Sequence, residues 1–220
     1  ENTVVVLTED YNTATHGSFT ACTVTVAENK TLIISANEYV TIQYHLTTET
    51  GALIRVLDDG SLVMVNNEGV VTNNGTMEME RQTTPFKRYD YVYWSSPLSN
   101  ATLNPNFPGW RWDYAFQFAT ANFIDLLTIN SSGTVLAAVP DTFDDYAPWA
   151  WQNITATTPL APGKGYAVMA STSGTFPRTA TVTFRGIGNS NKFRAVKDKL
   201  ELPHLDIDEI TDTVWMERFS

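Results

Sequence analysis

The chain has 220 residues, of which 14 are Lys or Arg and 24 are Asp or Glu, so its formal net charge is -10. Hydrophobic residues make up 43%, which is too much apolar material for a disordered acidic tail. The few basic residues are scattered, which excludes a duplex-binding protein and predicts no nucleic-acid partner. No apolar run reaches the roughly 18 residues of a membrane helix, so we expect no membrane insertion.

The residue types favour an extracellular β protein. Thr occurs 31 times and Asn 16 times, and a single cysteine, Cys22, rules out an internal disulfide framework. The first residue is Glu1, and no basic, apolar signal segment precedes it. We therefore expect a mature or excised piece of a longer protein.

A short strand followed by a polar or glycine turn recurs between residues 23 and 81. The predicted strands cover residues 23–26, 31–35, 39–43, 52–56, 61–65 and 76–80. Starts at 31, 52 and 76 are spaced by 21 and 24 residues, which predicts a short β-solenoid with two strands per coil. Asn and Gly at the corners fit turns that need a positive φ. The side chains expected inside are Leu32, Ile34, Leu53, Leu62, Met64, Met77 and Met79.

An antiparallel meander shows the same alternation and turns, and it stays open as the alternative. Asn74-Gly75 is a strong hairpin signal and favours that alternative. We prefer the solenoid because the strands recur near one period.

The second half, residues 84–187, is rich in aromatic residues and proline. Its candidate strands cover residues 89–94, 112–119, 133–139, 165–170 and 179–185, and residues 120–130 form either a helix or a strand. The fold class is therefore all-β, with a solenoid-like or meander domain at 1–83 and an antiparallel β-sandwich or jelly roll at 84–187. Residues 188–220 form an acidic C-terminal extension, the start of a following segment or a docking segment.

Residues with catalytic chemistry are few, and we predict that the chain is not an enzyme. The histidines His16, His45 and His204 are far apart and show no zinc-type spacing. Cys22 opens a strand, where a free cysteine is usually a small buried hydrophobe. We expect no catalytic residue and no cofactor.

Metal binding has one weak candidate, the acidic cluster of Asp141, Asp144 and Asp145. Calcium takes carboxylate and carbonyl oxygens, so a structural calcium ion is the hypothesis. The alternative is a group of solvated surface acids, because the cluster does not follow the twelve-residue calcium loop.

Two tryptophan pairs are the best binding signal. Trp110 and Trp112 flank Arg111, and Trp149 and Trp151 flank Ala150, so on a strand each pair shares one face. Such a face would form a platform on which sugars stack. The preferred alternative is that these rings fill the core, because large aromatic residues dominate cores. The other aromatic residues at this spacing are plainer core candidates: Tyr89, Tyr91, Tyr93, Phe116 and Phe118.

Three segments carry a resemblance to a known group of proteins. They are Asp90-Tyr-Val-Tyr-Trp-Ser-Ser-Pro97, Leu160-Ala-Pro-Gly-Lys-Gly-Tyr-Ala167 and Thr181-Val-Thr-Phe-Arg-Gly186. They resemble modules of large secreted surface proteins of Bacteroidetes, and the resemblance covers about residues 10 to 187. It implies export by the type IX secretion route and a place in adhesin-like or gliding-related proteins. The chain departs from the family pattern after residue 187, because family members continue into another β module where this chain has the acidic segment 188–220.

Type IX cargo carries O-glycans at Asp-Ser/Thr followed by an aliphatic residue, and Asp212-Thr213-Val214 resembles that motif, with Thr213 as the acceptor. From the residues and the resemblance together, we expect a non-catalytic extracellular spacer or adhesive unit of a cell-surface protein. The alternatives are a carbohydrate-binding module and a structural subunit of a filament or layer. The expected partners are other surface modules or copies of the chain itself, polysaccharide, and the secretion machinery.

Overall fold

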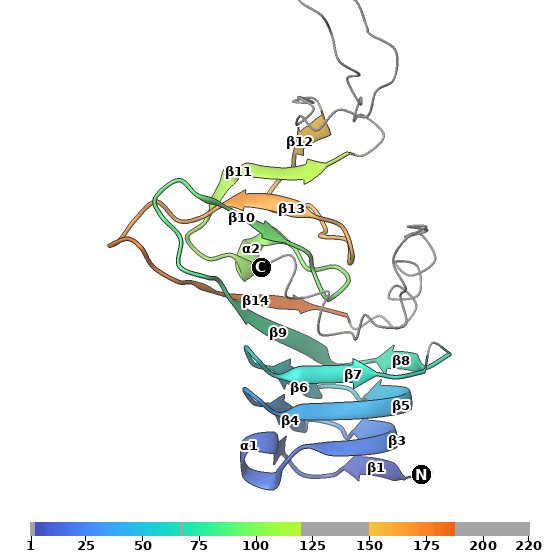
Figure 1. Ribbon diagram of the computed structural model, residues 1–220. Helices are drawn as coiled ribbons and strands as arrows, with labels where there is room; N and C mark the ends of the chain where they lie inside the picture. The colour runs from blue at the N-terminus through green and yellow to red at the C-terminus, as the bar shows by residue number, and fades with distance from the viewer. Residues whose placement is uncertain (1–2, 67, 120–149, 188–220) are drawn as a thin grey trace, which may run out of the picture.

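The computed structural model describes residues 3–66, 68–119 and 150–187. These residues form an N-terminal β-solenoid of about three turns and a separate antiparallel sheet of four strands, which confirms the all-β class and the solenoid (Figure 1). The solenoid elements are β1 (Val4–Leu7), β2 (Tyr11–Asn12), α1 (Thr13–His16), β3 (Phe19–Val26), β4 (Thr31–Ile34), β5 (Tyr39–Thr48), β6 (Leu53–Val56), β7 (Ser61–Met64), β8 (Val70–Asn73) and β9 (Thr76–Gln82).

The remaining described elements belong to the second half of the chain. They are β10 (Tyr91–Trp94), α2 (Leu103–Asn106), β11 (Arg111–Phe118), β12 (Trp151–Asn153), β13 (Tyr166–Met169) and β14 (Thr181–Gly186). The predicted strand at 133–139, the ambiguous segment 120–130 and the acidic extension 188–220 lie outside the described residues.

Successive coils of the solenoid pair in parallel. One sheet has the order β1-β3-β5-β7, with β8 also on β5, and the other stacks β2, β4, β6 and β9. The meander alternative is wrong, because a meander pairs consecutive strands antiparallel. Asn74-Gly75 forms a corner between β8 and β9, which lie in different sheets. The Asn-Gly pair favoured a hairpin in the sequence, but a corner that leads from one sheet into the next uses the same residue types.

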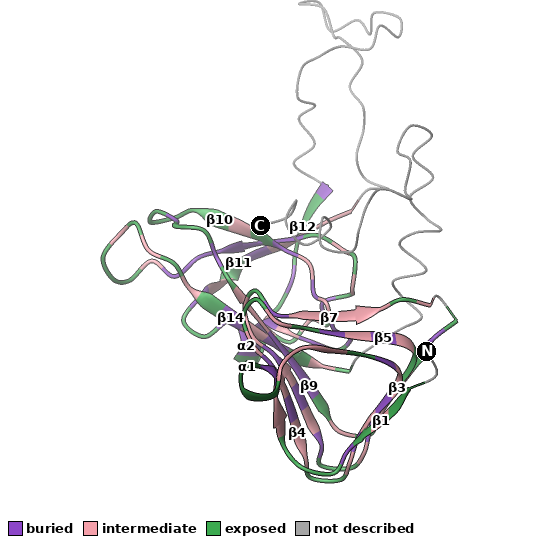
Figure 2. Ribbon diagram, turned by 60° about the horizontal axis from the view of Figure 1, so that its bottom comes forward, coloured by how far each residue is buried: buried purple, intermediate pink, exposed green. Residues whose placement is uncertain are grey.

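Each middle coil has three straight sides instead of the predicted two. The pairing of β3 with β5 shifts register between Ala21 and Thr23, where both strands bend. In the next coil β7 pairs with the first part of β5 and β8 with its second part. Viewed nearly along the stack, the coils superpose on one outline (Figure 2). Sequence inspection missed β8 because its four residues lie between two Asn- and Gly-rich turns.

The predicted interior is correct at most positions. Leu32, Ile34, Met77 and Met79 are buried, and Leu62 and Met64 pack partly buried against the same core. The inward position predicted for Leu53 is wrong. Its side chain lies half-buried on the outward face, whereas Ile54 and Val56 point inward. Because Ala52, Leu53 and Ile54 are all apolar, these residues do not show which side chains of the strand point inward. Arg55 reveals it, because Leu53 shares a face with that charged side chain.

Two corner glycines are required by the close approach of successive coils. A Cβ atom at Gly69 would lie 2.2 Å from the carbonyl oxygen of Tyr44, and one at Gly75 would lie 2.2 Å from that of Ala52. At other corners the expected positive φ occurs, as at Asn29 (57°) and Asp59 (59°). Corner residues therefore meet two separate requirements: some must adopt a positive φ, and others must lack a Cβ atom so that successive coils can approach closely.

The strand β14 closes one end of the solenoid. It pairs antiparallel with β9 and places Phe184 opposite Met79, so the strand predicted at 179–185 extends a solenoid sheet. Phe184 contacts Trp94 and Phe107 edge-to-face, with ring centroids 5.8 Å and 5.6 Å apart. Trp110 joins the same cluster at 5.7 Å from Trp94. One continuous hydrophobic core therefore runs from the coils into the second half of the chain.

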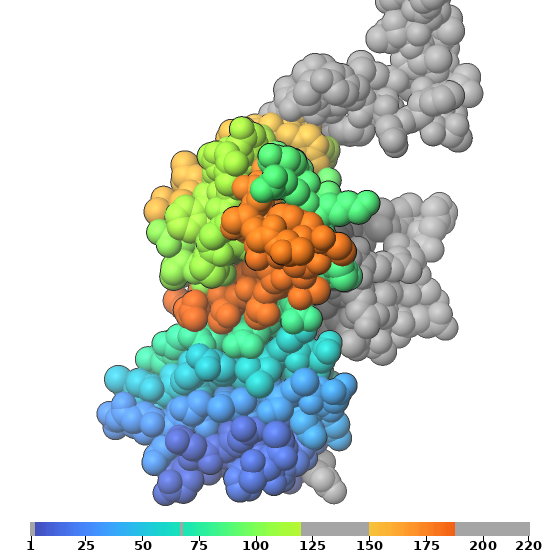
Figure 3. All heavy atoms as spheres, turned by 90° about the vertical axis from the view of Figure 1, so that its left-hand side faces the viewer, coloured from blue at the N-terminus to red at the C-terminus, as the bar shows by residue number. Residues whose placement is uncertain are grey.

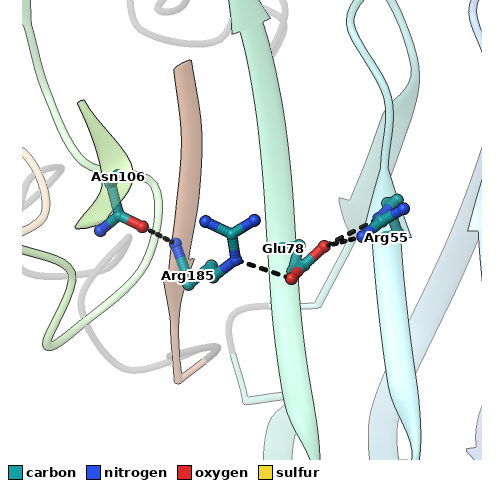
Figure 4. Close-up of polar contacts among 4 residues, drawn as sticks. All are labelled: Arg55, Glu78, Asn106 and Arg185. Carbon is teal, nitrogen blue, oxygen red and sulfur yellow. Dashed lines mark hydrogen bonds and ion pairs between the residues drawn. The ribbon is translucent and has the colours of Figure 1, made fainter. Parts of the chain in front are cut away.

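A polar network ties the same strands together on the outer face (Figure 4). Arg55 Nε donates to one Glu78 carboxylate oxygen at 2.7 Å, and Arg185 Nε donates to the other at 2.8 Å. The backbone N–H of Arg185 donates to Asn106 Oδ1 at 3.2 Å, so α2 covers the free edge of β14. Burial raises the pKa of the Glu78 carboxyl, but the hydrogen bonds and charges of the two arginines outweigh burial, and its net pKa is lowered.

The Gly75→Ala substitution should destabilise the solenoid by about 1–3 kcal/mol, the usual cost of overpacking, because the added methyl meets a backbone carbonyl that cannot move freely. The matched control is Gly165→Ala, where an added Cβ meets nothing within 4 Å. Urea unfolding followed by far-ultraviolet circular dichroism measures both. Equal free energies of unfolding for the two variants would contradict the packing argument.

The Glu78→Gln substitution should lower the free energy of unfolding by about 1–3 kcal/mol at neutral pH, because it removes charged hydrogen bonds from two arginines. The folded pKa of Glu78 is lowered, so this stabilisation is present above about pH 4.5, the ordinary pKa of a Glu carboxyl. It is lost as the pH falls further, through the folded pKa. Glu80→Gln, on the same face of β9, is the control. Urea unfolding between pH 3 and 7 tests the idea, and an undiminished wild-type advantage at the lowest pH would refute it.

Candidate binding surface

The four-stranded sheet has a buried face and an open face. Its order is β10-β13-β11-β12, and all its pairs are antiparallel. The inward side chains of Trp94, Ala115, Tyr166 and Val168 are buried in the core. In Figure 3 the segments 84–119 and 150–187, which supply these strands, form one body above the coils. The alternate residues of the strands point away from that core.

The open face is lined by aromatic side chains. We call it the aromatic face, and it consists of Tyr91, Tyr93, Tyr114, Phe116, Phe118 and Trp151. Tyr93 is 54% exposed and Trp151 is 38% exposed. Exposed aromatic groups gathered on one face mark interaction sites more often than scattered ones do.

The rings of the aromatic face contact one another across strands. The Tyr91 and Phe116 ring centroids are 6.0 Å apart. Trp151 lies 5.1 Å from Phe118 and 6.2 Å from Tyr93. Two neighbouring groups of rings therefore stand on this sheet, and their mutual contacts restrict the side-chain rotamers.

The charged groups beside the aromatic face neutralise each other. Arg111 donates two hydrogen bonds to the Asp113 carboxylate, at 2.9 Å and 2.5 Å, and its guanidinium lies 4.6 Å from the centroid of the Tyr114 ring. The hydrogen bond to Asp113 raises the pKa of Arg111, and the same bond lowers the pKa of Asp113, so both stay charged. Partial desolvation raises the pKa of Tyr91, whose hydroxyl therefore stays neutral. The face presents rings and hydroxyl groups without net charge.

The predicted platform of Trp110 and Trp112 does not form. Trp110 is only 6% exposed and lies in the core cluster. Trp112 is partly buried, and its indole N–H donates to the Phe107 carbonyl at 2.9 Å. The register shifts between Arg111 and Ala115, so the simple two-residue alternation fails at the start of β11. Trp149 lies outside the described residues, and Trp151 lies on the aromatic face.

Sequence inspection assigned the other aromatic residues to the wrong side. Tyr89, Tyr91 and Tyr93 were expected in the core, yet all three are exposed. The available signal was the strand β10 itself, in which Val92 and Trp94 alternate with Tyr91 and Tyr93. Since only one set can point inward, the set with hydroxyl groups is the better choice for the solvent side.

The remaining predicted sites are only partly covered by the structure. The calcium candidates Asp141, Asp144 and Asp145 and the glycan acceptor Thr213 lie outside the described residues. Within the described ranges no three His, Cys, Asp or Glu side chains are grouped as a metal site. In those same ranges no helix is long and apolar enough to cross a membrane. Cys22 is part-exposed on β3, where we expected a buried residue.

Two of the three segments that carry the resemblance, 90–97 and 160–167, meet in space. Trp94 pairs with Tyr166 across β10 and β13, and Ser96 forms a bridge with Pro162. The Tyr166 hydroxyl accepts the backbone N–H of Ala161 at 2.7 Å. These residues therefore fix how the two strands enter the sheet, and their role is to build the aromatic face rather than to line it.

Trp110→Ala should destabilise the fold by about 3–5 kcal/mol, because it leaves a cavity in a tightly packed aromatic cluster. Trp151→Ala should cost less, about 1 kcal/mol, because its side chain lies outside the core cluster and is 38% exposed. Urea unfolding of both variants separates the core tryptophan from the surface one. Similar losses for the two would show that their placement on opposite sides is wrong.

Comparison with known proteins gives one match. A family model described as a domain of unknown function, DUF8693, matches residues 1–198 and so spans both the solenoid and the four-stranded sheet. No curated protein and no solved structure matches the chain. On the extent of that match, the chain belongs to the DUF8693 family.

Proposed function

We propose that this chain is a non-catalytic module of a large secreted cell-surface protein, in which it serves as a spacer and an adhesive unit. One observation carries the proposal: a solenoid shares a continuous core with a sheet whose outer face is lined by exposed aromatic rings. The first part gives length and stiffness, and the second gives a surface that can hold a partner.

The spacer role rests on how the coils are joined. Parallel pairing bonds each coil to the next along its sides, and β14 bonds the last coil to the second half of the chain. The Glu78 network adds charged hydrogen bonds at this junction. The two parts are therefore linked by a sheet instead of a flexible tether, which suits a unit that transmits force.

The secreted location rests on the sequence resemblance to type IX cargo and on the extracellular residue composition. The motif residues Trp94, Tyr166 and Phe184 are all buried in the core or the sheet. Neighbouring surface modules and the secretion machinery are the partners that this location implies.

A second candidate function, a subunit of a filament or layer, is favoured by one feature. β1 is the edge strand of its sheet, and its outward residues Val4 and Val6 are 66% and 53% exposed. Open strand edges with apolar side chains can template pairing with another chain. We rank it second because the aromatic face gathers six aromatic side chains, whereas the β1 edge offers two exposed valines.

The adhesive role predicts that beads coated with the purified chain are retained in a flow chamber. They should stay under shear on surfaces bearing extracellular matrix material, whereas albumin-coated beads wash away. Retention at the albumin level on every surface would contradict the proposal. Sedimentation velocity on the same sample tests the second candidate, since a filament subunit assembles as its concentration rises and an adhesive module stays monomeric.

A further inference from the structure

We infer that the aromatic face binds a neutral polysaccharide through stacking of sugar rings. This inference rests on the proposed adhesive function and names its ligand. It places the binding surface on β10, β11, β12 and β13, and not on the tryptophan pairs of the sequence.

The rings hold one another at fixed angles, with 53° between the planes of Tyr93 and Trp151 and 65° between those of Phe118 and Trp151. Tyr93 and Trp151 come from the two edge strands of the sheet, yet their rings lie 6.2 Å apart. They approach because β13 presents only the methyl group of Ala167 in the row that contains Tyr93. Phe118 packs on Trp151 at 5.1 Å and holds it in place. A ligand therefore meets rings whose positions are set beforehand, which lowers the entropy lost on binding.

The width of the face indicates an oligomeric ligand. Three spacings between four strands, each about 4.8 Å, give a width of roughly 14 Å. Two contact groups of rings stand on this sheet, one formed by Tyr91 and Phe116 and the other by Trp151 with Tyr93 and Phe118. A single sugar ring would cover only part of this surface. Several linked sugars would engage both groups.

The polar groups of the face match a polyhydroxylated, uncharged partner. The hydroxyls of Tyr91, Tyr93 and Tyr114 stand among apolar rings, so hydrogen bonds and stacking are available side by side. Arg111 and Asp113 cancel each other's charge. The net charge of -10 on the chain repels polyanions, which disfavours nucleic acids and acidic polysaccharides.

Affinity electrophoresis of the full chain in gels containing soluble neutral polysaccharides (a panel of glucans, mannans and xylans) tests the inference. At least one member should retard the chain. Trp151→Ala and Tyr93→Ala should each weaken that binding about tenfold, by analogy with the loss of one nucleobase stacked on an aromatic side chain. Tyr44→Ala is the matched control, because Tyr44 is a 44% exposed tyrosine on β5 of the solenoid. Circular dichroism and urea unfolding verify that each variant is folded.

The outcomes separate this inference from the proposed function. Retardation that the Trp151 and Tyr93 variants lose and the Tyr44 variant keeps supports the inference. It is overturned if these variants bind normally, if polygalacturonate is preferred to every neutral polymer, or if the face instead mediates self-association that Trp151→Ala abolishes. Beads that adhere while no neutral polysaccharide retards the chain leave the adhesive function standing and reject the ligand. Beads that never adhere reject the adhesive function itself.

Discussion

The fold depends on one inward column of side chains that continues across four hydrogen-bonded strands. Ile34, Val56, Met79 and Phe184 occupy matching register positions on β4, β6, β9 and β14. Each buries its side chain against the next, which is how stacked coils obtain a core that no single coil could form. The column ends on Phe184, whose ring meets Trp94 and Phe107. The solenoid and the second half are therefore parts of one hydrophobic body.

This column also determines what lies on the outer surface. Because side chains alternate along a strand, fixing Val56 and Met79 inward forces Arg55 and Glu78 outward, where they align with Arg185. The same alternation acts in β10, where burying Trp94 in the core directs Tyr91 and Tyr93 to solvent. The aromatic face is thus a consequence of core packing. Its rings are exposed because the side chains on the opposite face of each strand fill the core.

Sequence inspection succeeded where the pattern repeats and failed where it is broken. The solenoid was predictable, since the recurrence near 22 residues and the alternation within strands agree on it. The third side of the coils was not, because the residues at the register shift, Ala21-Cys22-Thr23, carry no turn signal. For the binding surface, the two-residue spacing of Trp110 and Trp112 suggested a platform. The irregular start of β11 instead sends Trp110 into the core and leaves Trp112 partly covered.

The sequence alone determined the class of fold and the stacking of the first half. These properties follow from composition and short-range periodicity, which are local features. Only the tertiary structure decided which aromatic residues are buried and that the strand at 181–186 closes the solenoid. Both depend on contacts between segments about 100 residues apart, such as Met79 with Phe184. A local sequence pattern does not show such a contact, because the face of a strand that becomes buried is the face that a distant segment of the chain packs against.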